Sequence, residues 1–242
     1  MKAYLDNNIL IDIEYGKYLL SEFLSVPGIE YYYSDAHLGE LLEAKDNPKV
    51  SQEKRLSLIS TVCGKNFIVT GVLDPPEFLQ KAPEDMFILA DSPLRNSIKI
   101  MALQGASIFE KIRIDLDFDS HTFNNEKPED VLRILNSRMS EKMGIGLLPY
   151  LVRSEALGGR PLFYTLLNII DTANYWGDVK TNRSEVAKLY DASHAYFAQI
   201  CDVLVSDDKR MRAKVKAIYS FLGIGTKVIS AKEFIAITKV ST

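Results

Sequence analysis

The chain has 242 residues, of which 47% are hydrophobic and 25% are charged, so it can bury one large core or one core with a sizeable insertion. Its formal net charge of -3 gives no global sign of a nucleic-acid partner, although a local basic patch is compatible with an acidic average. Only two cysteines occur, Cys63 and Cys201, and neither lies in a CxxC arrangement, which argues against a disulfide framework and against a thiolate zinc site.

The first 45 residues contain two strand patterns, each followed by a helix pattern. Residues 3–5 form a short apolar strand, and a helix is expected from residue 9 to about residue 24, where a proline and a glycine follow. Residues 29–34 are rich in aromatic β-formers, and Ser34 is suited to cap a helix over 36–45, which carries leucines at helical spacing.

The last third of the chain repeats this alternation. Helices are expected at 161–177, 184–201 and 209–223, strands at 202–206 and 226–230, and a short tail helix at 231–237. Alternating strands and helices favour an α/β fold with a central parallel sheet, built from residues 1–45 and 165–242. Residues 46–164 are predicted to be a mostly helical insertion or cap, which could belong to the same domain.

Two of the strand patterns are followed directly by carboxylates. Asp6 follows the first strand, and Asp207 and Asp208 follow the strand at 202–206. Ligand sites in open parallel sheets gather at the carboxyl ends of the strands, so the three acids are expected on one rim if these strands are neighbours. Taken singly, each of them is more often a turn or capping residue.

Two further acids lie within predicted helices. Asp191 lies mid-helix, where aspartate is unfavourable, and the flanking Ala187 and Ala195 would let the helix pack closely while directing the carboxylate into a cleft. Glu40 by itself reads as a surface glutamate. Four acids in one site would repel one another unless a cation lay among them, and oxygen-only ligation suits Mg²⁺ or Mn²⁺. Such a cluster is typical of metal-dependent phosphodiester hydrolysis.

These motifs, in this order, resemble the PIN-domain nucleases. The resemblance lies in AYLDNNIL, in YYSDAHLGEL with its helical glutamate, and in DASHAYFAQICDVLVSDDKRM, a helical aspartate followed by an apolar strand and a Ser-x-Asp. It covers about residues 1–45 and 165–235 and implies a three-layer fold with a central parallel sheet. The positions that hold the divalent metal in that family fall on Asp6, Glu40, Asp191 and Asp208.

The resemblance also assigns supporting positions. Asn8 and Ser206 match the polar residues that support the acids, and Asp207 fills the variable place between Ser206 and Asp208, where it could be an extra ligand. His194 could orient the neighbouring carboxylate or a water, although a histidine satisfied by the backbone is the commoner case.

The function that this resemblance implies is an Mg²⁺- or Mn²⁺-dependent endonuclease that cuts RNA more readily than DNA. Members of that family often act as toxins held by an antitoxin, so an inhibitory protein partner is a further expectation. The segment 46–164 is much longer than in compact members, and it could cover the site, bind a partner or form an oligomer.

A basic helix directly follows the acidic rim. It could hold a phosphate backbone, and a solvated face of an amphipathic helix accounts for it equally well. The cations in question are Lys209, Arg210, Arg212, Lys214 and Lys216, of which the first three are the nearest candidates for nucleic-acid contact.

A separate acidic run, DLDFDSHTFNNE, has the spacing of an EF-hand calcium loop at Asp115, Asp117, Asp119 and Glu126. The sixth position holds serine where the sharp turn needs glycine, and apolar residues alternate with charged ones over 111–118. The sequence therefore favours an edge strand over a calcium site.

Two rival functions share some of these features. A phosphatase of the haloacid-dehalogenase type also begins with an aspartate after its first strand, but it needs a second aspartate where this chain has Asn8. A PIN-like scaffold that binds nucleic acid or a protein partner and cuts slowly or never is the stronger rival, and four mutually repelling acids argue against it. The N-terminal segment lacks a signal-peptide pattern and no apolar run reaches the roughly 18 residues of a membrane span, so a cytoplasmic location is expected.

Overall fold

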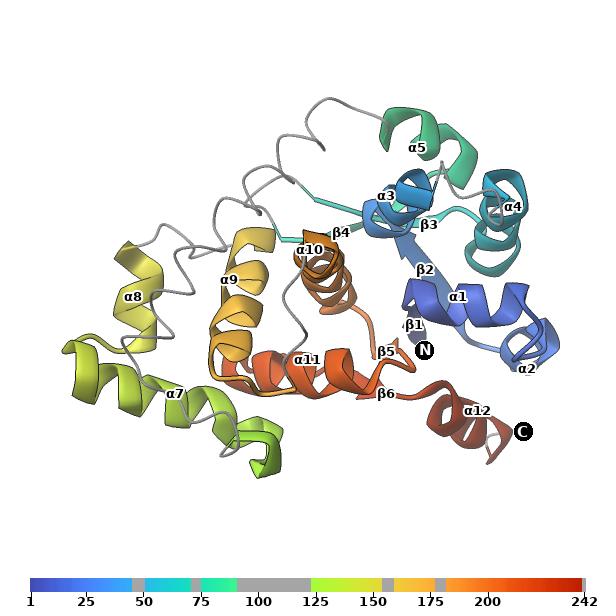
Figure 1. Ribbon diagram of the computed structural model, residues 1–242. Helices are drawn as coiled ribbons and strands as arrows, with labels where there is room; N and C mark the ends of the chain where they lie inside the picture. Colours follow the sequence, from blue (N-terminus) through green and yellow to red (C-terminus); the bar gives the residue numbers. More distant parts are fainter. Residues whose placement is uncertain (45–50, 71–74, 91–122, 154–158, 177–181, 241–242) are drawn as a thin grey trace.

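The computed structural model describes residues 1–44, 51–70, 75–90, 123–153, 159–176 and 182–240 (Figure 1). The strands are β1 (Lys2–Leu5), β2 (Glu30–Ser34), β3 (Asn66–Val69), β4 (Glu77–Gln80), β5 (Val203–Val205) and β6 (Lys227–Ile229). The helices are α1 (Asn7–Glu14), α2 (Leu20–Leu24), α3 (Asp35–Glu43), α4 (Gln52–Cys63), α5 (Pro83–Ala90), η2 (Phe123–Asn125), α7 (Pro128–Met143), α8 (Leu147–Arg153), α9 (Gly159–Thr172), α10 (Asn182–Ala198), α11 (Lys209–Leu222) and α12 (Ala231–Val240).

The strands form one six-stranded sheet in the order β4-β3-β2-β1-β5-β6, which confirms the predicted α/β class. All neighbouring pairs are parallel except β3 and β4, so the sheet is mixed where a parallel one was expected. The connection over residues 70–76 is too short for the crossover that a parallel strand requires, and β4 therefore returns antiparallel. The first strand lies in the middle of the sheet, between β2 and β5.

The sheet separates two hydrophobic cores, because successive side chains of a strand point to opposite faces. Tyr4 and Leu204 point into one core with residues of α7, α9, α10 and α11. Leu5 and Val205 point into the other core with residues of α1, α2, α4 and α12. Helices therefore cover both faces of the sheet (Figure 1), and full burial of each large apolar side chain contributes about 1.5–3 kcal/mol.

The predicted helix over residues 9–24 is wrong in its continuity. The chain forms α1 and α2 as two separate helices, and Gly16 between them has a φ of 75°. That left-handed conformation costs glycine little and interrupts a right-handed helix. By contrast, α11 ends as predicted at Gly223, which has a positive φ, and α7 ends in the same way at Gly144.

The segment 46–164 is not only helical in its described part. It supplies β3 and β4 to the sheet, and its helix α7 packs along α11. It therefore shares the sheet and the cores with both ends of the chain. The predicted strand at 111–118 and most of the EF-hand-like run lie outside the described residues.

Within the described ranges, no helix combines the length and apolar character needed to cross a membrane.

Candidate active site

Four elements bring the predicted acids to the carboxyl end of the sheet. Asp6 follows β1, Glu40 lies in α3, Asp191 lies in α10, and Asp208 is the N-cap of α11. Burial raises the pKa of Asp191 well above its usual range, and the charges of the other three acids raise it further. The structure thus places Asp6, Glu40, Asp191 and Asp208 within electrostatic reach of one another, and these four are the acidic cluster.

Asp6 is the most rigidly held member of the acidic cluster. Its side chain is 5% exposed, and its Oδ2 accepts hydrogen bonds from the Ser206 hydroxyl at 2.7 Å and from the Asn8 amide. Asn8 also donates to Ser206 Oγ at 2.9 Å. These two residues, predicted as supporting positions, join the end of β1 to the turn after β5. Burial, with the charge of Glu40, raises the pKa of Asp6 to about 6, although the charge of His194 lowers it.

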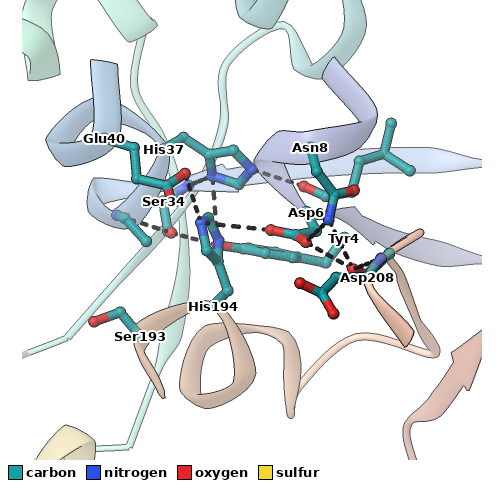
Figure 2. A network of polar contacts seen from close by, with 12 residues as sticks. Tyr4, Asp6, Asn8, Ser34, His37, Glu40, Ser193, His194 and Asp208 are labelled. Atoms are coloured by element: carbon teal, nitrogen blue, oxygen red, sulfur yellow. Dashed lines mark hydrogen bonds and ion pairs between the residues drawn. The ribbon is translucent and has the colours of Figure 1, made fainter. Parts of the chain in front are cut away.

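His194 lies at the centre of the site (Figure 2). It is fully buried, and its Nε2 lies 3.2 Å from Glu40 Oε2 and 3.7 Å from Asp6 Oδ1. Burial alone would lower the pKa of His194, but the hydrogen bond and charge of Glu40, together with the charges of Asp6 and Asp191, raise it to about 9. The imidazolium therefore offsets part of the negative charge at neutral pH. The His194 ring contacts carboxylates. It is therefore not a histidine of the commoner kind, whose nitrogens are satisfied by the backbone.

The other three acids line the more open side of the site. Glu40 has a side-chain exposure of 27%, Asp191 is partly buried and Asp208 is exposed. Asp208 Oδ1 accepts hydrogen bonds from the backbone amides of Arg210 at 2.7 Å and Met211 at 3.0 Å. Asp6 and His194 thus form a buried floor, while solvent reaches the cluster past Glu40 and Asp208.

A second histidine, His37, lies beneath this floor, and the sequence reasoning missed it. Its ring centroid is 4.8 Å from that of His194 and 4.9 Å from that of Tyr4. Tyr4 Oη lies 2.8 Å from His194 Nδ1 and 2.7 Å from Ser34 Oγ, so the floor is a connected polar network (Figure 2). The spacing in the sequence indicated this pair of histidines. His37 precedes Glu40 by three residues and His194 follows Asp191 by three, and residues three apart in a helix are neighbours on its surface.

The chemistry of the acidic cluster fits a hard divalent cation. Mg²⁺ and Mn²⁺ prefer carboxylate oxygens, and a cation would relieve the repulsion that raises the pKa of Asp6 and Asp191. The spacing of the four carboxylates does not yet form a metal-binding arrangement. Within the described part of the chain, no three histidine, cysteine, aspartate or glutamate side chains are already arranged as a metal site. The carboxylates would therefore have to approach one another more closely to hold an ion.

Comparisons with protein-family models, with curated proteins and with solved structures give no match to this chain.

Asp207 points away from the acidic cluster. Its Oδ2 accepts a hydrogen bond from Tyr18 at 2.6 Å and lies 3.1 Å from Lys17 Nζ, while its Oδ1 accepts from the backbone amide of Ala231 at 3.0 Å. Both oxygens thus serve contacts with the α1–α2 connection and the start of α12. The structure does not bring Asp207 together with the other four acids.

The basic helix α11 divides its cations between solvent and the protein interior. Lys209, Arg210 and Lys216 are exposed, whereas Arg212 is partly buried and donates to the Ser206 carbonyl at 2.6 Å. Lys214 is buried, so neither phosphate contact nor a solvated face describes it. Lys209 and Arg210 remain the candidates for phosphate contact, because they lie in the first turn after Asp208.

Lys214 belongs to a second buried group of charges that joins α9, α10 and α11. Its Nζ lies 2.7 Å from Asp171 Oδ1, and Lys188 Nζ lies 2.9 Å from Asp171 Oδ2 and 3.0 Å from Glu185 Oε1. Asn168 Oδ1 accepts a further hydrogen bond from Lys188 at 2.9 Å. This lysine network consists of Asn168, Asp171, Glu185, Lys188 and Lys214, and sequence reasoning gave no sign of it.

Proposed function

We propose that the protein is a divalent-metal-dependent endonuclease with a three-layer, PIN-like fold, which hydrolyses phosphodiester bonds in RNA more readily than in DNA. The observation that carries the proposal is the convergence of four acids from β1, α3, α10 and α11 at one end of the sheet. The sheet order supports it, because β1 lies between β2 and β5 and so brings Asp6 beside a turn 200 residues later in the chain.

Asp6, Glu40, Asp191 and Asp208 would hold Mg²⁺ or Mn²⁺. When bound, the ion supplies a Lewis acid that activates water for attack at phosphorus and stabilises charge on the leaving oxygen. Ser206 and Asn8 fix the orientation of Asp6 through their hydrogen bonds to its carboxylate. A ligand held by such outer partners is oriented before the ion arrives, which strengthens metal affinity.

His194 contributes to the site through its position between two of the acids. Its Nε2–H group donates to Glu40 and faces Asp6, which holds these carboxylates on the same side of the floor. Its positive charge reduces their mutual repulsion in the metal-free protein. Lys209 and Arg210, exposed in the first turn of α11, are placed to contact the phosphate backbone of a bound strand.

The alternative is a PIN-like scaffold that binds nucleic acid or a protein and cuts slowly or never. One observation favours it: the described residues present no ready-made metal group, and His194 already compensates part of the acidic charge. A protein that never binds an ion could tolerate the acidic cluster in this way.

The preference for RNA over DNA comes from the family resemblance.

The test is hydrolysis of matched single-stranded RNA and DNA oligonucleotides with Mn²⁺ and with EDTA. Asp6→Asn and Asp208→Asn should each reduce Mn²⁺-dependent cutting by about 100-fold or more, because each removes a carboxylate of the cluster. Asp207→Asn is the matched control, since it makes the same change one residue from Asp208 on a side chain that points away. Equal cutting by all four proteins would contradict the proposal and leave the scaffold as the better account.

A further inference from the structure

His37 lies where two neighbouring strands separate beneath the acidic cluster. The pairing of β1 with β2 ends at Tyr4 and Tyr32, whereas the pairing of β1 with β5 continues to Leu5. Beyond this point β2 continues to Ser34, paired only with β3 among the described strands, and then passes directly into α3, while β1 continues to Asp6. The His37 side chain, which is 1% exposed, fills the opening between them.

Its two ring nitrogens make different hydrogen bonds. Nδ1 accepts from the backbone amide of Ser34 at 3.1 Å, so the ring proton lies on Nε2, which donates to the Leu5 carbonyl at 2.7 Å. The bond to Ser34 belongs to the cap of α3. The bond to Leu5 takes the place of the next rung of the β1–β2 ladder, because it satisfies the carbonyl that β2 no longer reaches.

The bond to Leu5 has a consequence for the acids above it. Leu5 directly precedes Asp6, and His37 lies one helical turn before Glu40. One imidazole therefore ties the backbone that carries Asp6 to the helix that carries Glu40. His194 Nε2 lies between these two carboxylates, 3.2 Å from one and 3.7 Å from the other, so their separation decides whether one group can reach both.

We propose that His37 is a positioning residue, which sets the separation of Asp6 and Glu40 through its hydrogen bond to the Leu5 carbonyl. The inference rests on the proposed function, in which these two acids hold one divalent ion. His37 itself touches neither acid. Outer residues that orient metal ligands typically change metal affinity by about 10–100-fold when they are replaced.

Two substitutions separate the two hydrogen bonds. In His37→Asn, the amide oxygen lies near the place of Nδ1 and can accept from Ser34, but no donor reaches Leu5. In His37→Gln, the amide nitrogen lies near the place of Nε2 and can donate to Leu5, but the cap bond to Ser34 is lost. Both variants bury a primary amide in place of an imidazole, so each serves as the stability control for the other.

The measurements are the Mn²⁺ dissociation constant of each protein without nucleic acid and the melting temperature in EDTA. Both variants should melt below the wild type, because each loses one buried hydrogen bond. His37→Asn should bind Mn²⁺ about ten-fold more weakly than wild type, whereas His37→Gln should stay within about three-fold. Equal Mn²⁺ affinities in the two variants would show that His37 only stabilises the fold and would overturn the inference.

Crystal structures of both variants grown in EDTA decide the inference without any metal. The separation of the Asp6 and Glu40 backbones should increase in His37→Asn and stay at the wild-type value in His37→Gln. The same separation in both would overturn the positioning role. If wild type itself binds no Mn²⁺ and cuts neither nucleic acid, the proposed function fails, and these structures still show whether His37 sets the separation.

Discussion

The two buried groups of charged side chains in this molecule differ in their balance. The lysine network sets two acids, Asp171 and Glu185, against two lysines, and each lysine has a carboxylate within 3.0 Å. The acidic cluster sets four carboxylates against the imidazolium of His194 at its centre, with a further contribution from the charge of Lys214 at Asp191. Burial and repulsion raise the pKa of both Asp6 and Asp191. Both groups involve α10, so they differ in charge balance more than in location.

Because of this difference, the charges of the lysine network neutralise one another, whereas the acidic cluster keeps an excess of negative charge that a cation could balance. A balanced, hydrogen-bonded ion group needs nothing further, although its net gain over apolar packing is small. An acidic excess in a partly buried place is unfavourable by itself, and strongly perturbed carboxylates of this kind are concentrated at functional sites. The charge balance of the lysine network is therefore consistent with a role in the fold, and the acidic excess of the cluster supports the function proposed above.

The largest expected effect on stability comes from breaking the balance of the lysine network. Lys188→Met leaves Glu185 and one oxygen of Asp171 without their cation, which should cost about 3–5 kcal/mol of unfolding free energy. Urea denaturation in EDTA measures this loss. The Mn²⁺ dependence of cutting by the folded variant should be unchanged, and a variant as stable as wild type would contradict the structural assignment.

An intermediate effect is expected from pH. The folded-state pKa of His194 is about 9, above its ordinary value of 6.5, so its stabilisation is complete below pH 6.5 and is lost as pH rises through 9. The loss is on the order of 3 kcal/mol in metal-free protein. The raised pKa values of Asp6 and Asp191 act in the same direction, since their ionisation on rising pH also disfavours the folded state.

His194→Gln isolates this contribution, because it keeps a polar side chain and cannot titrate. The difference between the denaturation midpoints at pH 6.5 and pH 9, both measured in EDTA, should be smaller in the variant than in wild type. If the variant shows the full wild-type slope, His194 does not carry the positive charge of the site.

The smallest effect is expected from replacing one aspartate by asparagine, which should change the stability of the two groups in opposite directions. Asp191→Asn removes a carboxylate that burial and three neighbouring acids disfavour, so metal-free protein should gain about 1 kcal/mol and melt about 2–4 °C higher. Asp171→Asn, the matched change in the lysine network, should lower the melting temperature because Lys188 and Lys214 each lose a carboxylate partner. Destabilisation by both substitutions would contradict the contrast between the groups.

Sequence patterns predicted much of the fold because the signals were local. The β1, β2, β5 and β6 strands, and helices such as α10 and α11, follow from apolar periodicity and from capping residues. The strand β4 and the helix α5 were missed, because prolines at 75, 76 and 83 read as breaks in the chain. In the structure, Pro83 lies in the first turn of α5, where its missing amide proton is not needed.

Asp6 and Asp208 were predictable because each follows a strand, and Asp191 because it lies mid-helix, whereas Glu40 was expected only from the family resemblance. The contacts of His37 were not predictable, since its partner Leu5 is 32 residues away in the chain and only the divergence of β1 from β2 creates the opening. The lysine network was missed for a similar reason. Lys188 and Lys214 look like ordinary surface lysines until α9, α10 and α11 pack together.

The most direct test of the central claim, that the acidic cluster is a divalent-metal site, is a thermal unfolding titration with Mn²⁺. Wild type should be stabilised in proportion to the logarithm of the Mn²⁺ concentration, reaching about 2.7 kcal/mol at 100 times the dissociation constant. Asp191→Asn should lose this shift, and Asp207→Asn should keep it, because only Asp191 lies in the cluster. If neither Mn²⁺ nor Mg²⁺ raises the melting temperature of wild type, or if Asp191→Asn responds as wild type does, the four acids do not form a metal site.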